Sequence, residues 1–166
     1  MTWPGAWPSH ILATSRQRLA ELQLEVDSLP SDVSVATEQA MTRFLVVRAC
    51  GHIEFTFDEA FCSYAESKSS PPIAAFVRSQ FFRGSNPSAE RIEVGLRKLD
   101  PARADRFVLL IDAEDQKVRR ELGFLVDRRN KIAHGQSESV ARRKALDLAD
   151  IALSLGDWVM TELDPR

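Results

Sequence analysis

The sequence is poor in cysteine and glycine. Its two cysteines in 166 residues cannot form the disulfide framework that stabilises small secreted domains. Cys50 and Cys62 fall on one predicted helix, too far apart along its axis for a disulfide, and neither belongs to a Cys/His cluster with zinc-site spacing. We therefore expect two reduced, buried thiols, no metal site and no bound cofactor.

Long apolar runs are also missing. No segment is apolar over the length needed to cross a bilayer. The first ten residues, MTWPGAWPSH, have neither the basic nor the apolar region of a secretory signal peptide. These absences favour a cytoplasmic protein that does not bind membranes.

The chain has no excess of positive charge. It contains 22 lysines and arginines against 24 aspartates and glutamates, for a formal net charge of -2. A protein that covers nucleic acid with much of its surface is normally basic. Any contact with RNA must therefore be local and made by a few placed cations. Reading of the DNA major groove is disfavoured further, since no helix-turn-helix pattern is recognisable.

Strand-like alternation is absent, and a helical period recurs along the chain. The length fits one domain, which we place at residues 9–164, after a flexible arm over residues 1–8 that carries Trp3 and Trp7. The pattern predicts an all-α, antiparallel bundle of about five to seven helices. Ser31 or Asp32 is the expected cap of the second helix, and Gly84 the expected end of the third. The predicted helices span about 9–28, 32–67, 71–84, 87–99, 101–111, 113–133 and 139–163.

The segment GFLVDRRNKIAHG, residues 123–135, holds the residues best suited to chemistry. Arg129 continues an apolar stripe formed by Val118, Leu122 and Leu125. A guanidinium in that position is costly unless it is paired or lies at a wet interface. Asn130 and His134 are four residues apart, on neighbouring turns of one helix face.

These residue types suit the cleavage of a phosphodiester bond. A histidine titrates near neutral pH and can take the proton of a ribose 2'-hydroxyl. An arginine can hold the charge that develops on the phosphate, an asparagine can orient either group, and no metal is required. A structural role stays open, because basic residues and a capping Gly135 are also typical of a helix C-terminus.

Three segments resemble the HEPN superfamily. RNKIAHG resembles its Arg-x4-6-His motif, in which a polar residue commonly follows the arginine. RFLVVRACGHIEFTFDEAF resembles its long second helix, and NPSAERIEVGLRKLDP with the apolar helix after it resembles the middle of the RiboL-PSP-HEPN branch. The resemblance covers residues 38–160, approximately. It implies a helical homodimer whose motifs face each other.

The same resemblance implies a metal-independent endoribonuclease that acts on RNA and leaves 2',3'-cyclic phosphate ends. Such domains are typical of toxin-antitoxin and phage-defence systems, so a cognate antitoxin or defence partner is expected. Carried onto this sequence, Arg129 binds and polarises the phosphate, His134 is the acid/base, and Asn130 supports it. Arg128 also fits the spacing, but Arg129 is preferred because it lies on the apolar stripe and directly precedes Asn130. Arg128 and Lys131 are then candidate substrate-binding cations.

Glu54 is a further candidate. It interrupts an apolar series on the second helix formed by Val47, Cys50, Phe57 and Phe61. A carboxylate there requires a cation, and superfamily members often carry an acidic residue near the motif. The hypothesis is that Glu54 pairs with Arg129 or His134 and assists catalysis, and the alternative is an ion pair that only fixes packing.

Two other functions stay open. In the first, the chain is a non-catalytic HEPN module that dimerises and binds a nucleotide, RNA or a protein. It can also be a helical interaction subunit in which RNKIAHG is only a helix end. Retention of the arginine, asparagine and histidine together favours the enzyme. His52 is expected to be a packed histidine rather than a ligand.

Overall fold

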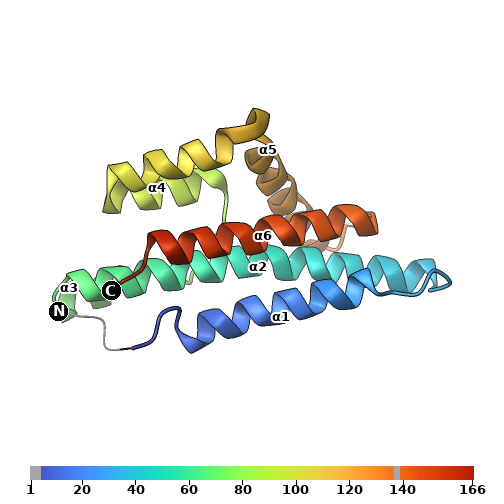
Figure 1. The fold of residues 1–166 in the computed structure, drawn as a ribbon, viewed down its shortest axis with the longest axis horizontal. Coiled ribbons are helices and arrows are strands. Elements are labelled where there is room, and N and C mark those ends of the chain that lie inside the picture. The colour runs from blue at the N-terminus through green and yellow to red at the C-terminus, as the bar shows by residue number, and fades with distance from the viewer. Residues whose placement is uncertain (1–4, 137–138) are drawn as a thin grey trace.

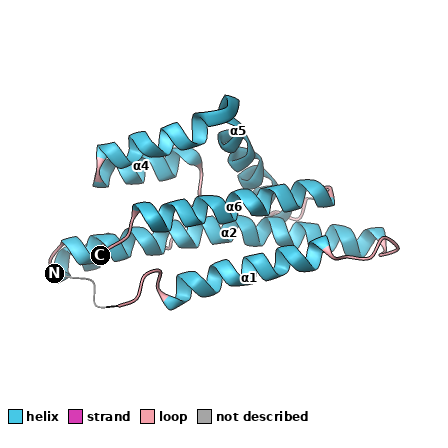
Figure 2. Cartoon of the chain, in the orientation of Figure 1, coloured by secondary structure: helices cyan, strands magenta, loops and turns pink. Residues whose placement is uncertain are grey.

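The computed structural model describes residues 5–136 and 139–166 (Figure 1). The described residues form helices joined by loops and no strand, which confirms the predicted all-α class (Figure 2). The helices are α1 (His10–Asp27), α2 (Val35–Lys68), α3 (Pro71–Ser79), α4 (Ala89–Leu99), α5 (Pro101–Ala133) and α6 (Arg142–Glu162).

The long helix α2 and helix α6 lie side by side through the middle of the molecule (Figure 1). They run in the same direction, because Arg142 bonds Glu38 near one end and Lys68 bonds the carbonyl of Pro165 near the other. Helix α1 runs antiparallel to both and is tied to α6 by a bidentate contact from Arg16 to Asp157. Helices α4 and α5 lie on the other side of the α2–α6 pair from α1 (Figure 1).

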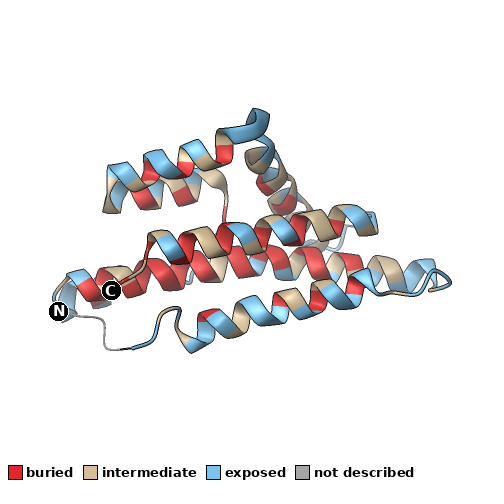
Figure 3. Cartoon of the chain, in the orientation of Figure 1, coloured by how far each residue is buried: buried red, intermediate tan, exposed pale blue. Residues whose placement is uncertain are grey.

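The core lies where α2 and α6 meet their neighbours, and buried residues follow the inner faces of these helices (Figure 3). Small side chains on α6, among them Ala145, Ala149 and Ala152, are fully buried and let the two helices approach closely. Cys50 and Cys62 are free and buried, as expected. Burial raises the pKa of each thiol to about 12, so neither is a reactive thiolate.

Several predicted helix ends are wrong. Helix α2 is capped by Ser34, whose hydroxyl accepts the backbone N–H of Thr37, rather than by Ser31 or Asp32. Helix α3 ends at Ser79, and Gly84 lies in the following loop with a φ of 68°. Helix α6 begins at Arg142 instead of Ser139. At α2 the true cap is a serine close to the two predicted caps and offers an equivalent signal in sequence, whereas α6 begins after Ala141 with no side-chain cap.

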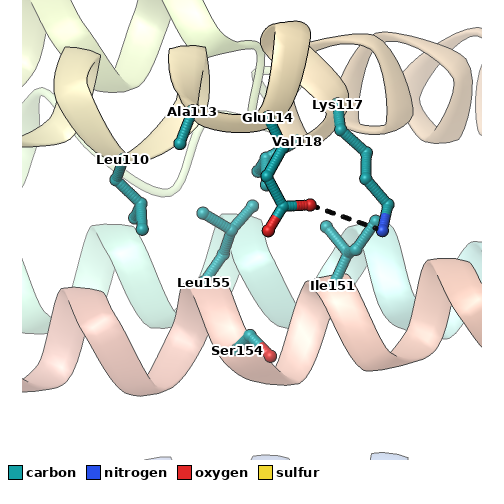
Figure 4. A pocket seen from close by; sticks show the side chains of 8 residues that line it. All are labelled: Leu110, Ala113, Glu114, Lys117, Val118, Ile151, Ser154 and Leu155. Atoms are coloured by element: carbon teal, nitrogen blue, oxygen red, sulfur yellow. Dashed lines mark ion pairs between the residues drawn. The ribbon is translucent and has the colours of Figure 1, made fainter.

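The helices expected over 101–111 and 113–133 form one element, α5, with a sharp break between its halves. Ala113 is extended, and Glu114, Asp115 and Gln116 have φ values of 51°, 55° and 61°. Beside the break lies a cavity of about 310 Å³ against α6, over which Glu114 and Lys117 form an ion pair (Figure 4). The break sends the second half of α5 back across α6 and α2.

In the described part of the arm before α1, Trp7 is hydrogen-bonded to the bundle. The indole N–H of Trp7 donates a 2.8 Å hydrogen bond to the carbonyl of Met160 on α6. Trp3 lies outside the described residues. Of the helices that the structure describes, none is long and apolar enough to cross a membrane.

Candidate functional site

The RNKIAHG segment forms the last turns of α5, at the point where this helix meets the middle of α2. Leu122 and Leu125 are fully buried, and Arg129 follows them on the same stripe as a half-buried residue. The predicted stripe is therefore confirmed. It directs the guanidinium of Arg129 toward α2 while leaving part of it open to solvent.

Arg129 acts electrostatically on two residues of α2. Its positive charge lowers the pKa of Cys50 and of Glu54, although burial has the larger and opposite effect on each. The guanidinium Nη1 donates a 3.2 Å hydrogen bond to the side-chain oxygen of Asn130. Among the described residues, no carboxylate lies within ion-pair distance of Arg129. The guanidinium is thus hydrogen-bonded to a neutral amide, and its positive charge remains available to an anion.

Glu54 is half-buried on the side of α2 that faces Arg129. Burial raises its pKa, and the nearby Asp58 raises it further, while Arg129 and Arg91 act in the opposite direction. In the described part of the chain Glu54 forms no ion pair with Arg129 or His134. The carboxylate and the guanidinium therefore interact through charge at longer range.

His134 is the C-cap residue of α5 and is exposed. Its backbone N–H donates to the carbonyl of Asn130 at 3.0 Å, and Gly135, with a φ of 73°, closes the helix through the carbonyl of Ile132. The imidazole makes no hydrogen bond to a described residue. The cap accounts for Gly135, whereas nothing in it requires an imidazole at position 134.

The other two basic candidates lie elsewhere on α5. Arg128 is half-buried over the ring of Phe124, 4.7 Å from its centroid, and Lys144 of α6 lies over the same ring at 4.9 Å. Lys131 pairs with Asp127 at 3.1 Å. Arg128 thus lies toward α6 and Arg129 toward α2, which agrees with the preference for Arg129 as the motif arginine.

The structure also shows a cluster that the sequence analysis did not single out. Asp58 of α2 is buried, accepts a 2.6 Å hydrogen bond from Arg91 of α4, and accepts another from the backbone N–H of Phe82. The guanidinium of Arg91 lies over the rings of Phe57 and Phe81. The only signal in sequence is a charged residue inside an apolar stretch of α2, as for Glu54.

Comparison with known proteins identifies one family. The family model described as RiboL-PSP-HEPN matches residues 13–157, which include every candidate residue on α2 and α5. No curated protein and no solved structure matches the chain.

Proposed function

The chain belongs to the RiboL-PSP-HEPN family, and on that premise we propose that it is a metal-independent endoribonuclease of a toxin-antitoxin or phage-defence system. One observation carries the proposal. The last turns of α5 and its C-cap hold an arginine with no carboxylate partner among the described residues, the amide that it binds, and an exposed imidazole. This set supplies the charge and the proton transfer that cleavage of RNA requires.

The reaction follows from these groups. The imidazole of His134 takes the proton of the ribose 2'-hydroxyl, and the 2'-oxygen attacks the adjacent phosphorus. The bond to the 5'-oxygen breaks, and an imidazolium returns a proton to that oxygen. The products are a 2',3'-cyclic phosphate and a 5'-hydroxyl. Arg129 stabilises the charge on the phosphate in the transition state, and Asn130 holds its guanidinium.

A second copy of the chain would complete the site. One imidazole cannot be both unprotonated base and protonated acid in the same step, so the same residue from a second copy provides the other role. An exposed apolar surface supports this arrangement. Phe44 of α2 is 52% exposed, and Val47, two turns before Glu54, is half-exposed. This apolar surface beside the motif is suited to dimerisation.

The test compares wild type with His134→Ala and Arg129→Ala on total RNA and tRNA in EDTA. Arg97→Ala is the control, because Arg97 lies on α4 in exposed ion pairs with Glu93 and Asp105. We expect wild type and the control to cut RNA and leave cyclic phosphate ends. Each motif variant should lose about 100-fold or more of the rate, as is typical when an acid/base or phosphate-binding group is removed.

Folding and oligomeric state are measured on the same samples by circular dichroism and light scattering. Absence of cutting by wild type, or equal cutting by all four proteins, would contradict the proposal. A folded dimer without activity would instead support a non-catalytic HEPN module. In that case the motif residues would only end helix α5, through the regular cap at Gly135.

A further inference from the structure

A cavity of about 520 Å³ lies between α1 and α2, apart from the motif. Arg18 of α1 and Arg48 of α2 both line it, and no carboxylate does. The hydroxyl-bearing Thr14 and Ser15 form part of its wall, and Phe55 and Ile11 add apolar surface. The cavity is therefore positively charged on one side and apolar on the other.

The two arginines differ from their neighbours in having no partner. Neither Arg18 nor Arg48 makes a hydrogen bond, ion pair or ring contact with any described residue. By contrast Arg16, on the same helix as Arg18, binds Asp157 through two hydrogen bonds. Two unpaired guanidinium groups that face one cavity repel each other, and an anion between them relieves that repulsion.

The cavity lies next to the part of α2 that faces the motif arginine. Gly51 lines the cavity and is one helical turn from Glu54, the carboxylate whose pKa responds to Arg129. A β-carbon at Gly51 would meet nothing within 4 Å, so the surface of α2 is open there. An extended strand bound at Arg129 can therefore cross α2 over Gly51 and reach Arg48 and Arg18.

We infer that this cavity binds a backbone phosphate of the RNA strand, next to the phosphate that is cleaved. The inference rests on the proposed function for its substrate. Arg18 and Arg48 hold the phosphate oxygens, and the ring of Phe55 contacts the neighbouring ribose or base. Free phosphate shares the charged chemistry, but the apolar wall and the size of the cavity favour a nucleotide unit within a strand.

The first experiment measures binding without cleavage. A fully 2'-O-methylated single-stranded RNA is titrated over a range of salt concentrations with wild type, with R18Q/R48Q and with R97Q/R166Q. The last variant removes the same charge from exposed, ion-paired arginines. We expect R18Q/R48Q to lose about tenfold or more in affinity, and the slope of log K against log[salt] to fall by about 1.4, or 0.7 for each contact to a single strand. The control should match wild type.

The second experiment measures cleavage of an extended RNA and of a dinucleoside monophosphate, which has no flanking phosphate. The value of kcat/KM should fall in R18Q/R48Q at least tenfold more on the extended RNA than on the dinucleotide. A wild type that binds RNA but cuts neither substrate would overturn the proposed function, while loss of binding in R18Q/R48Q would still support this inference.

Two results would overturn the inference. One is an unchanged affinity and salt slope in R18Q/R48Q, with folding verified by circular dichroism. The other is loss of inorganic phosphate binding in that variant with no change for RNA, which would assign the cavity to a small free anion. Both arginines are exposed, so the double variant is expected to fold.

Discussion

The imidazole of His52 on α2 lies directly against the backbone of Gly156 on α6. A β-carbon at position 156 would stand 2.6 Å from Nε2 of His52. His52 is only 3% exposed, and its Nδ1 is hydrogen-bonded to the hydroxyl of Ser15 at 2.9 Å. The ring thus fills the space where α1, α2 and α6 meet, which confirms that it is a packed histidine.

This contact predicts opposite effects for two glycine-to-alanine changes. Gly156→Ala should lower the free energy of unfolding by about 1–3 kcal/mol, because His52 must move within a packed core. Gly51→Ala should raise it by up to about 1 kcal/mol, since its β-carbon meets no atom within 4 Å and alanine favours the helix. Urea unfolding of both variants measures the difference. Similar values for the two would show that α2 and α6 are not packed as described.

The buried position of His52 also predicts how stability depends on pH. Burial lowers the pKa of His52 from 6.5 to about 4, so the folded state binds fewer protons than the unfolded state between these values. The contribution of His52 to the free energy of unfolding should be largest above pH 6.5. It should decrease by about 3 kcal/mol in total as the pH falls toward 4. Unfolding followed at several pH values measures the slope.

His52→Gln is the variant that isolates this effect, because glutamine can keep a hydrogen bond to Ser15 and does not titrate. Its stability should change less than that of wild type between pH 6.5 and 4. Gly51→Ala changes no titratable group, so it serves as the control and should keep the wild-type slope. The same slope in all three proteins would place the pH dependence in other groups.

The buried pair of Asp58 and Arg91 should dominate the stability of the loop after α3. Asp58→Ala removes the acceptor of both Arg91 and the backbone N–H of Phe82, and it leaves a largely buried guanidinium without its counter-charge. We expect a loss of about 3 kcal/mol in unfolding free energy and faster proteolysis between α3 and α4. Asp147→Ala breaks an exposed pair with Arg143 and should cost about 0.5 kcal/mol or less.

The motif and the cavity differ in how well sequence predicts them. The stripe of Leu122, Leu125 and Arg129 lies on one helix, so its spacing alone places the arginine correctly. Arg18 and Arg48 come together only because α1 packs on α2, a tertiary contact that no spacing within either helix records. The pairing of Asp58 with Arg91 is of the same kind.

The break in α5 is a further feature that the sequence predicted only in part. The sequence predicted two helices that meet near this point, one over about 101–111 and one over about 113–133. It did not predict the left-handed backbone at Glu114, Asp115 and Gln116, because none of these is glycine. The two halves meet beside the cavity against α6, and residues of both halves line it (Figure 4).

Glycine should therefore be favourable in the break and unfavourable elsewhere in α5. Asp115 has a φ of 55°, which costs an L-residue about 1 kcal/mol or more and costs glycine almost nothing. Asp115→Gly should stabilise the protein, whereas Asp105→Gly, in the regular part of the helix, should destabilise it by about 1 kcal/mol. Thermal unfolding of both variants gives the comparison, and a loss of stability in both would contradict the strained backbone.

Glu54 offers the sharpest test of how α2 assists the motif. If its carboxylate positions Arg129, Glu54→Gln should raise KM for RNA about tenfold, because the neutral amide no longer attracts the guanidinium that binds phosphate. The pKa of Glu54 is raised, chiefly by burial, so ionisation of this group should appear in the acid limb of the rate profile of wild type and be absent from the variant. Glu90→Gln, on the exposed side of α4, is the control.

Stability separates this positioning role from a purely structural one. Folding raises the pKa of the Glu54 carboxyl, so the folded protein becomes less stable as the pH rises from the unfolded-state pKa to the folded-state pKa of this group. At neutral pH the uncharged glutamine should therefore make the protein more stable. If Glu54 positions Arg129, the Glu54→Gln protein should therefore be more stable than wild type but bind RNA less well. Glu54→Asp, which keeps the carboxylate, should partly restore RNA binding. A variant that folds, dimerises and keeps the wild-type KM and pH profile would restrict Glu54 to packing, because the charge it exerts on Arg129 would then have no consequence for the substrate.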